Sequence, residues 1–298
     1  MDRRPVEGLI ADRRLISCRQ TLGWPPMIET VKIEDVKEIA KRAGDEVLAV
    51  YGTEFSVDVK EDTSPLTEAD QRSNDVIVEA LNRLYPDIPV ISEETKAVEY
   101  SERKHWDHFW LVDPLDGTKE FIKRNGEFTV NIALVKGQMP ILGVVYQPVG
   151  DHLYWAQEGQ GAWKITGGGK AFKLEGGEHY SAKDSVTVVA SRSHLTDEVQ
   201  AFVDALKAEG KEVEFLSAGS SLKLCLVAEG GADVYPRLGP TMEWDTAAGD
   251  AIARAAGKSV TQWVPAPPEK PAVSHGGNKG EKVIYNKENL LNPWFIVD

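Results

Sequence analysis

The sequence predicts a mixed α/β protein with two lobes, and three patterns support that prediction. Apolar residues recur at helical spacing over residues 33–51. The middle of the chain carries short apolar runs separated by turn residues, a pattern typical of an antiparallel meander. After about Ala182, strand-like and helix-like segments alternate, as they do in α/β folds. We therefore expect an N-terminal α+β lobe over residues 27–184 and a C-terminal α/β lobe over residues 185–298.

The N-terminal lobe is expected to begin with two helices. The apolar spacing predicts the first helix over residues 33–51, directly before a glycine that ends it. A polar turn at residues 60–65 precedes the second helix, which begins at Thr67 and runs to about Tyr85. Residues 90–92 then form a short buried strand that ends at two glutamates.

The remaining elements follow from apolar runs and the turn residues between them. The predicted strands of the meander are the run that ends at Asp113, residues 128–135, residues 141–147 and short strands within residues 154–172. The predicted elements of the second lobe are strands at residues 186–190, 213–216 and 233–235, and helices at residues 196–208, 220–229 and 245–256. We expect the Pro- and Gly-rich tail after Pro265 to wrap over the surface.

Composition excludes several classes of protein. The formal net charge of −13 disfavours nucleic acid as a partner, because nucleic-acid binding depends on a basic surface. No apolar run approaches the roughly 20 residues that a membrane-spanning helix needs. Cys18 and Cys225 fit no disulfide or zinc pattern, which favours a cytoplasmic location. The Arg-rich residues 1–26 lack the apolar core of a secretory signal, and we interpret them as a disordered extension.

The most informative segment is Asp113-Pro114-Leu115-Asp116-Gly117-Thr118. An apolar strand ends at Asp113, and Pro114 prevents it from continuing as a paired central strand. The following turn is expected to bring Asp116 back beside Asp113. Two carboxylates this close repel each other unless a cation or a proton lies between them. Oxygen ligands of this kind suit hard cations such as Mg²⁺.

Three other acidic positions lie at the ends of predicted elements, and each has a structural explanation. Asp70 is the third residue of a helix capped by Thr67, where an acid stabilises the helix dipole. Glu93 could belong to a solvated turn. Asp245 could be a plain N-cap for a helix that starts at Thr246. Taken singly, none of the three requires a function.

Together these motifs resemble a known family. The Asp113–Thr118 segment resembles the signature of the lithium-sensitive, magnesium-dependent phosphatases of the inositol monophosphatase superfamily. The second signature, Trp244–Gly249, follows at the expected distance, Glu93 matches the upstream metal-binding glutamate, and residues 60–70 match a mobile loop and helix start. The resemblance implies a layered αβαβα sugar-phosphatase fold, with a metal site between two lobes.

Further segments narrow the resemblance to the bacterial 3'(2'),5'-bisphosphate nucleotidases. The matching segments are Lys119–Ile122, Asn125–Ala133, Gly219–Lys223 and Tyr235–Pro240. The implied reaction removes the 3'-phosphate from adenosine 3',5'-bisphosphate to give AMP, and clears this by-product during sulfur assimilation. The resemblance also allows 3'-phosphoadenylyl sulfate as a second substrate, and it implies inhibition by lithium.

The resemblance also implies roles for individual residues. The implied metal ligands are Glu93, Asp113, the backbone carbonyl of Leu115, Asp116 and Asp245. They would hold two Mg²⁺ ions, and the resemblance allows a third, weaker ion near Asp70 and Glu93. The implied catalytic residues are Asp70, Thr118 and Glu93, with Asp70 orienting the Thr118 hydroxyl toward the attacking water. Gly117 and Thr118 offer backbone N–H groups to phosphate oxygens.

The second lobe is expected to bind the rest of the substrate. Ser220 and Lys223 lie three residues apart at a predicted helix start and can face one phosphate. Taken alone, the pair would be explained better by a helix cap and a solvated lysine. Arg237 distinguishes better between a nucleotidase and an inositol phosphatase. Inositol phosphatases carry an acid at the matching position, whereas the planar guanidinium group of an arginine binds phosphate through two hydrogen bonds. We also expect His194 to lie against adenine or ribose.

Two other functions remain open at this stage. One is an inositol or sugar monophosphatase of the same superfamily, and the other is a non-catalytic nucleotide sensor that kept the fold. The expected partner is a small nucleotide, without nucleic acid or a transmembrane segment. The sequence leaves a monomer and a homodimer equally open, and it allows peripheral association with the inner face of the membrane.

Overall fold

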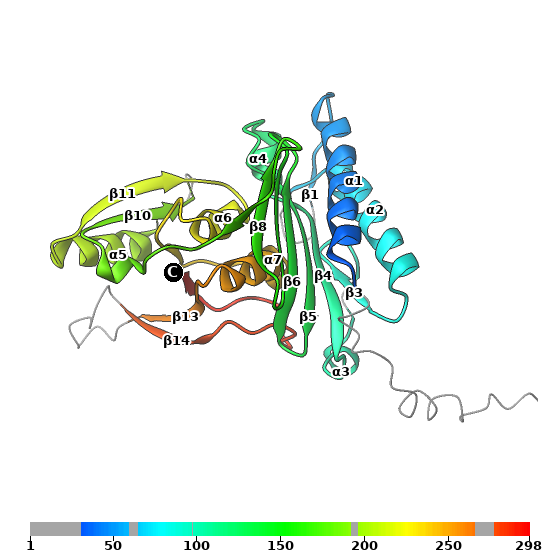
Figure 1. The fold of residues 1–298 in the computed structure, drawn as a ribbon. Coiled ribbons are helices and arrows are strands. Elements are labelled where there is room, and N and C mark those ends of the chain that lie inside the picture. The colour runs from blue at the N-terminus through cyan, green and yellow to red at the C-terminus, as the bar shows by residue number, and fades with distance from the viewer. Residues whose placement is uncertain (1–30, 60–64, 97, 192–195, 266–276) are drawn as a thin grey trace, which may run out of the picture.

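The structure is a computed structural model that describes residues 31–59, 65–96, 98–191, 196–265 and 277–298 (Figure 1). The predicted extension over residues 1–26, the polar turn at residues 60–64 and the candidate residue His194 lie outside these ranges.

A seven-stranded sheet forms the centre of the molecule (Figure 1). Its strands, in spatial as well as chain order, are β3 (Val90–Ser92), β4 (His108–Asp116), β5 (Thr129–Lys136), β6 (Met139–Gln147), β7 (His152–Gln157), β8 (Gly161–Thr166) and β9 (Phe172–Leu174). Strands β3 and β4 run parallel, and every later pair runs antiparallel. The predicted meander is therefore confirmed.

Helices cover both faces of this sheet. Helices α1 (Ile33–Tyr51) and α2 (Glu68–Leu84) pack on one face, and α7 (Glu243–Ala255) packs on the other (Figure 1). Strand side chains alternate between the two faces: Trp110 and Val112 join the core beneath α1 and α2, whereas Phe109 and Leu111 join the core around α7. The predicted boundaries of α1 and α2 are confirmed to within a residue.

The second half of the chain adds a further layer. Strands β10 (Ser185–Ala190) and β11 (Glu212–Ser217) pair in parallel, with α5 (Asp197–Ala208) packed against them. Helix α6 (Leu222–Ala228) packs beside α7. A four-stranded sheet has the order β12 (Tyr235–Arg237), β15 (Phe295–Val297), β13 (Val260–Pro265) and β14 (Gly277–Lys282). The predicted layered α/β class is confirmed, whereas the division into lobes at residue 184 stays a prediction.

The tail after Pro265 departs from its prediction. We expected it to wrap over the surface, but β15 inserts between β12 and β13 and pairs antiparallel with both. Phe295, Ile296 and Val297 are all buried there. The pairing joins residues far apart in the sequence, so local composition could not reveal it.

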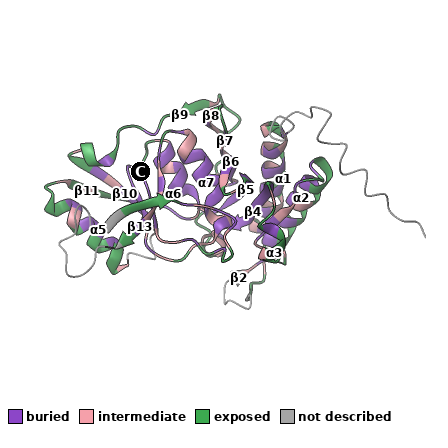
Figure 2. Ribbon diagram, turned by 90° about the horizontal axis from the view of Figure 1, so that it is seen from below, coloured by how far each residue is buried: buried purple, intermediate pink, exposed green. Residues whose placement is uncertain are grey.

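Helix α7 lies unusually close to the central sheet because of one glycine. A Cβ atom at Gly143 on β6 would lie 2.3 Å from the backbone oxygen of Ala248 and 2.9 Å from the Cβ of Ala251. Most of α7 is buried as a result, as the colouring of Figure 2 shows. This contact fixes the helix that carries Asp245 against the sheet that carries Asp113.

Short elements complete the described chain. They are β1 (Asp58–Val59), β2 (Pro65–Leu66), α3 (Tyr100–Arg103), α4 (Thr118–Ile122) and the 3₁₀ turn η3 (Tyr180–Ala182). Among the helices that the structure describes, none has the length and apolar character that crossing a membrane requires.

Candidate metal centre and phosphate pocket

Strand β4 continues past Asp113, contrary to the sequence prediction. Asp113 pairs with Asn131 on β5, the register then shifts, and Asp116 pairs with Thr129. Pro114 has no N–H to donate, so it interrupts the ladder as a bulge without ending the strand. The bulge, and not a strand end, places Asp113 and Asp116 close enough for the charge of one to raise the pKa of the other.

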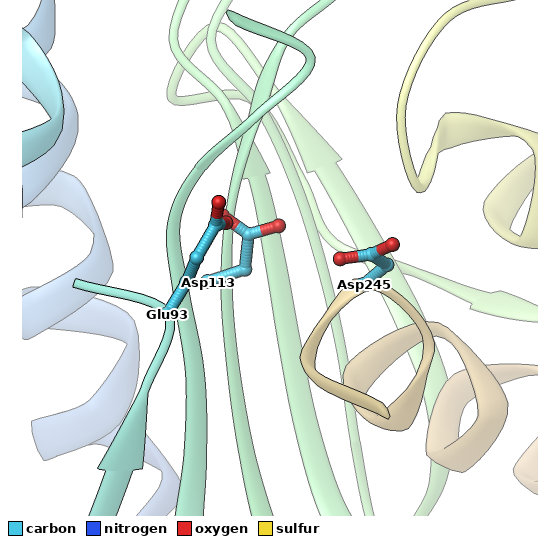
Figure 3. A group of neighbouring side chains, drawn as sticks. All are labelled: Glu93, Asp113 and Asp245. Carbon is cyan, nitrogen blue, oxygen red and sulfur yellow. The ribbon is translucent and has the colours of Figure 1, made fainter. Parts of the chain in front are cut away.

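Three carboxylates from separate elements converge beside this bulge (Figure 3). Glu93 follows β3, Asp113 belongs to β4, and Asp245 lies in the first turn of α7. One carboxylate oxygen from each lies within 4.8 Å of the others. Asp113 is buried, whereas Glu93 and Asp245 are half-buried, so the cluster opens on one side.

The acids of the cluster disfavour one another's ionised forms. Burial raises the pKa of Asp113 well above its ordinary value, and the charges of Glu93, Asp116, Asp245 and Asp70 raise it further. Burial likewise raises the pKa of Asp245 to about 8, with Asp116 as the next cause. Among the described residues, no basic side chain forms an ion pair with Asp113, Asp116 or Asp245. This set of hard oxygen donors fits a hard divalent cation.

Asp70 makes hydrogen bonds both to the start of its own helix and to Thr118. Its Oδ2 accepts hydrogen bonds from the Thr67 backbone N–H (2.8 Å) and hydroxyl (2.7 Å), which is the predicted capping arrangement. Its Oδ1 accepts from the Thr118 hydroxyl at 3.3 Å. Thr118 Oγ1 also lies 3.3 Å from the backbone oxygen of Leu115. The two interpretations of Asp70 are therefore compatible, because each uses a different carboxylate oxygen.

Asp245 has a similar arrangement on α7. The helix begins at Glu243, so Asp245 is its third residue and the prediction of a plain N-cap before Thr246 is wrong. Asp245 Oδ2 accepts a hydrogen bond from the Met242 backbone N–H at 3.0 Å. As at Asp70, one carboxylate oxygen caps the start of the helix. The same carboxyl group also belongs to the acidic cluster (Figure 3).

A pocket adjoins the cluster, and most predicted substrate residues line it. Its lining includes Asp116, Gly117, Ser220, Lys223, Arg237 and Asp245. The exposed Lys119 lies at its rim, and the sequence analysis gave this residue no role of its own. The lining therefore combines carboxylates with cationic side chains, a combination that suits a phosphate ester together with a metal ion.

Ser220 and Lys223 are not arranged as the sequence predicted. Helix α6 begins at Leu222, and Ser220 precedes it with a positive φ of 45°, so the two residues do not share a helix face. Lys223 is 6% exposed, which rules out a solvated lysine. Its ammonium group folds back to donate to the backbone oxygens of Ser220 (2.6 Å) and Ala218 (3.4 Å). Lys223 thus supports the loop that borders the pocket.

Polar atoms without partners point to a ligand in this pocket. Ser220 Oγ, Arg237 Nε and Thr241 Oγ1 are buried, and none has a hydrogen-bond partner within the described chain. All three residues line the same pocket. Because a buried polar group without a partner is costly, their shared location indicates a place for a polar ligand. The sequence analysis did not single out Thr241.

A second cavity of about 320 Å³ adjoins the first. Lys119, Ser191, Tyr235 and Arg237 line both. The rest of its lining is mainly apolar, from Ala190, Val199, Pro236, Leu238 and Pro240. The pocket with the charged lining therefore lies beside a cavity with a mainly apolar lining. His194, the predicted contact for the base or ribose, lies outside the described residues.

Comparison with known proteins agrees with the geometry. Residues 29–288 match the inositol monophosphatase family. The 3'(2'),5'-bisphosphate nucleotidase CysQ of Salmonella typhimurium is 46% identical over 270 residues, covering 89% of this chain and 98% of that protein. The Escherichia coli enzyme of the same name is 45% identical over the same coverage.

A solved structure of CysQ from Bacteroides thetaiotaomicron, described as a bacterial member of the inositol monophosphatase family, is also similar. It superposes with a TM-score of 0.74 at 48% sequence identity, covering 89% of this chain and 96% of that one. The similarity thus extends over the seven-stranded sheet and the elements that surround the acidic cluster.

Proposed function

The chain belongs to the inositol monophosphatase family, and we propose that it acts there as a magnesium-dependent 3'(2'),5'-bisphosphate nucleotidase. The proposed reaction converts adenosine 3',5'-bisphosphate to AMP and phosphate. It follows the names of relatives that are 45–46% identical over most of their length. The structural observation that carries it is the cluster of Glu93, Asp113 and Asp245 directly beside a pocket lined by Lys223 and Arg237.

The metal ligands are part of this proposal. Glu93, Asp113, Asp116, Asp245 and the backbone carbonyl of Leu115 would hold two Mg²⁺ ions, with a third, weaker one near Asp70 and Glu93. When bound, the cations supply positive charge that favours transfer of a phosphoryl group. The raised pKa of Asp113 supports this assignment, because burial and the charges of the neighbouring acids disfavour its ionised form, which a bound cation would stabilise.

Thr118 and Asp70 would position the attacking water. The Thr118 hydroxyl donates its hydrogen bond to Asp70 Oδ1 and the Leu115 carbonyl, so the lone pairs of Thr118 Oγ1 remain available to accept a hydrogen bond from a water molecule. That bond holds the water in one orientation for in-line attack. The Asp70 carboxylate is itself held by Thr67, which keeps the pair rigid.

The two adjoining cavities would divide the substrate between them. The backbone N–H groups of Gly117 and Thr118 would face the phosphate that is removed, and Arg237, Ser220 and Lys223 would face the second phosphate. The neighbouring cavity would take the nucleoside, because its lining is mostly apolar and shares Arg237 and Tyr235 with the phosphate pocket.

Two further expectations remain proposals. We infer a cytoplasmic location, since Cys225 is a buried free thiol and a reduced protein is consistent with it. The protein would act on its small-molecule substrate as a monomer or a homodimer.

A substrate panel tests the function. Phosphate release from adenosine 3',5'-bisphosphate should require Mg²⁺, stop with EDTA and exceed release from inositol 1-phosphate. A clear preference for inositol 1-phosphate would reassign the chain to the inositol phosphatases. Binding of the nucleotide without any Mg²⁺-dependent turnover would make it a sensor.

A further inference from the structure

A buried serine joins three elements that carry the candidate metal centre. Ser221 is 1% exposed and lies directly before α6. Its Oγ lies 2.7 Å from Asp116 Oδ2, 2.7 Å from the backbone oxygen of Asp245 and 2.7 Å from Asn131 Nδ2. One hydroxyl group therefore contacts the end of β4, the first turn of α7 and strand β5.

The donors and acceptors in this network are fixed by chemistry. The Asn131 amide nitrogen donates to Ser221 Oγ and also lies 3.4 Å from Asp116 Oδ2. The opposite orientation of the amide would place its oxygen against a carboxylate. Ser221 has a single hydroxyl proton, which is shared between Asp116 Oδ2 and the Asp245 carbonyl. The half-buried Asp116 thus receives hydrogen bonds from two neutral donors that are themselves buried.

Helix capping does not explain Ser221. It occupies the N-cap position of α6, but its side chain makes no capping hydrogen bond. Thr67 and Thr196, at the same position of α2 and α5, each accept a bond from their own helix. All the hydrogen bonds of the Ser221 hydroxyl therefore go to Asn131, Asp116 and Asp245.

We propose that Ser221 and Asn131 are positioning residues that hold Asp116 and the first turn of α7 at the separation a divalent cation requires. The inference rests on the proposed function, in which Asp116 and Asp245 are metal ligands. The two acids line the same pocket and carry like charges when ionised, so they repel each other. The shared serine proton opposes that repulsion by bonding Asp116 and the α7 backbone together before any cation binds.

The test measures Mg²⁺ affinity without nucleotide, by calorimetry and by the Mg²⁺ dependence of the melting temperature. Ser221→Ala should weaken Mg²⁺ binding about 10- to 100-fold, the usual effect of removing a partner of a metal ligand. Its metal-free melting temperature should stay within a few degrees of wild type, since α6 loses no cap. Ser259→Ala is the matched control: its hydroxyl donates to Asp298 Oδ1 at 2.5 Å, and it does not line the pocket.

A second variant tests the same network from β5. Asn131→Ala leaves the serine in place but removes its donor, and should also weaken Mg²⁺ binding. The double variant should fall short of the sum of the two effects, because Asn131 acts largely through Ser221. Excess Mg²⁺ should restore kcat in Ser221→Ala, whereas a purely structural defect would lower the metal-free melting temperature and would not respond to Mg²⁺.

The outcomes separate this inference from the proposed function. Mg²⁺ affinities of Ser221→Ala and Asn131→Ala within twofold of Ser259→Ala would overturn the positioning role while leaving the nucleotidase intact. If Ser221→Ala does not fold, Asn131→Ala decides alone. Failure of the wild-type protein to bind Mg²⁺ or to release phosphate would instead overturn the function itself.

Discussion

Helix α7 carries one half-buried acid and two buried acids, and their surroundings are opposite. Asp245, in its first turn, lies among other acids, and Asp116 is the charge that most raises its pKa. Glu243 and Asp250, on the same helix, are fully buried but have partners of the opposite kind. The same helix therefore carries one acid that lies among other acids and two acids that are bonded to basic side chains of the described residues.

The compensated acids are bonded on every side. Glu243 accepts from the Lys287 ammonium group at 2.5 Å and from the backbone N–H groups of Asn286 (2.6 Å) and Lys287 (3.0 Å). Asp250 forms an ion pair with Arg254 and accepts from the Tyr285 hydroxyl at 2.8 Å. Burial raises the pKa of Asp250, and these partners partly offset the rise.

The partners of these acids distinguish the candidate metal site from a structural ion pair. Burying a carboxylate is costly unless a cation or several hydrogen bonds compensate it. At Asp250 the chain supplies the cation. At Asp113, burial and the charges of Glu93, Asp116, Asp245 and Asp70 all disfavour the ionised carboxyl group, and no basic side chain within the described residues forms an ion pair with it.

The most decisive way to break this comparison is Asp113→Asn. We expect phosphate release to fall about 1,000-fold or more, because the central metal ligand loses its charge. The metal-free protein should melt at a higher temperature than wild type, since the repulsion among the buried acids is relieved. A variant that loses stability in EDTA would contradict the claim that Asp113 is uncompensated.

Arg254→Met tests the other side of the comparison. Removing this partner leaves Asp250 buried without its cation, a change that typically costs about 3–5 kcal/mol of unfolding free energy. Urea denaturation measures the loss, and the specific activity of the folded fraction should stay near wild type. A large loss of activity without a loss of stability would show that the two groups of acids are not separate.

Arg237→Glu tests the pocket beside the acidic cluster. Arg237 is a cation near that cluster, and its charge lowers the pKa of Asp245. The ratio of kcat/KM for adenosine 3',5'-bisphosphate to that for inositol 1-phosphate should fall about 10-fold or more, since the grip on the second phosphate is lost. An unchanged ratio would remove Arg237 from the account of specificity.

The smallest expected effect is on pH dependence. Asp113 and Asp245 have raised pKa values, so the folded, metal-free protein binds more protons than the unfolded chain. Unfolding free energy should therefore fall as pH rises above the ordinary carboxyl pKa of about 4, and the contribution of Asp245 to this fall should end near pH 8. Saturating Mg²⁺ should flatten this slope in melting curves, because it replaces the protons. Asp113→Asn should flatten it without Mg²⁺.

Local sequence patterns predicted the parts of the site that depend on local structure. The helix start at Thr67 placed Asp70 correctly, and the Asp113–Thr118 segment identified both the acidic pair and its neighbouring hydroxyl. The bulge at Pro114 could not be predicted, because it depends on a register with β5 that only the assembled sheet defines.

Long-range contacts account for the rest. Ser221 and Asn131 are 90 residues apart, and neither residue type suggests that the two will meet beside Asp116. The positive φ of Ser220 is uncommon for a serine, so helical spacing misplaced it on α6. Strand β15 joined a sheet whose other members precede it by at least a dozen residues, so its composition resembled that of a surface tail.

The close approach of α7 at Gly143 has a consequence for ion selectivity. Magnesium binds oxygen at about 2.0–2.1 Å and calcium at about 2.3–2.6 Å, so a difference of a few tenths of an ångström discriminates between them. Gly143→Ala would push α7 away from β6, since the new methyl group would overlap the Ala248 backbone oxygen. The gap between Asp245 and Asp113 would widen, and preference should shift toward the larger ion. On the proposed function, the absence of a single methyl group on a neighbouring strand would thus help to select the smaller cation.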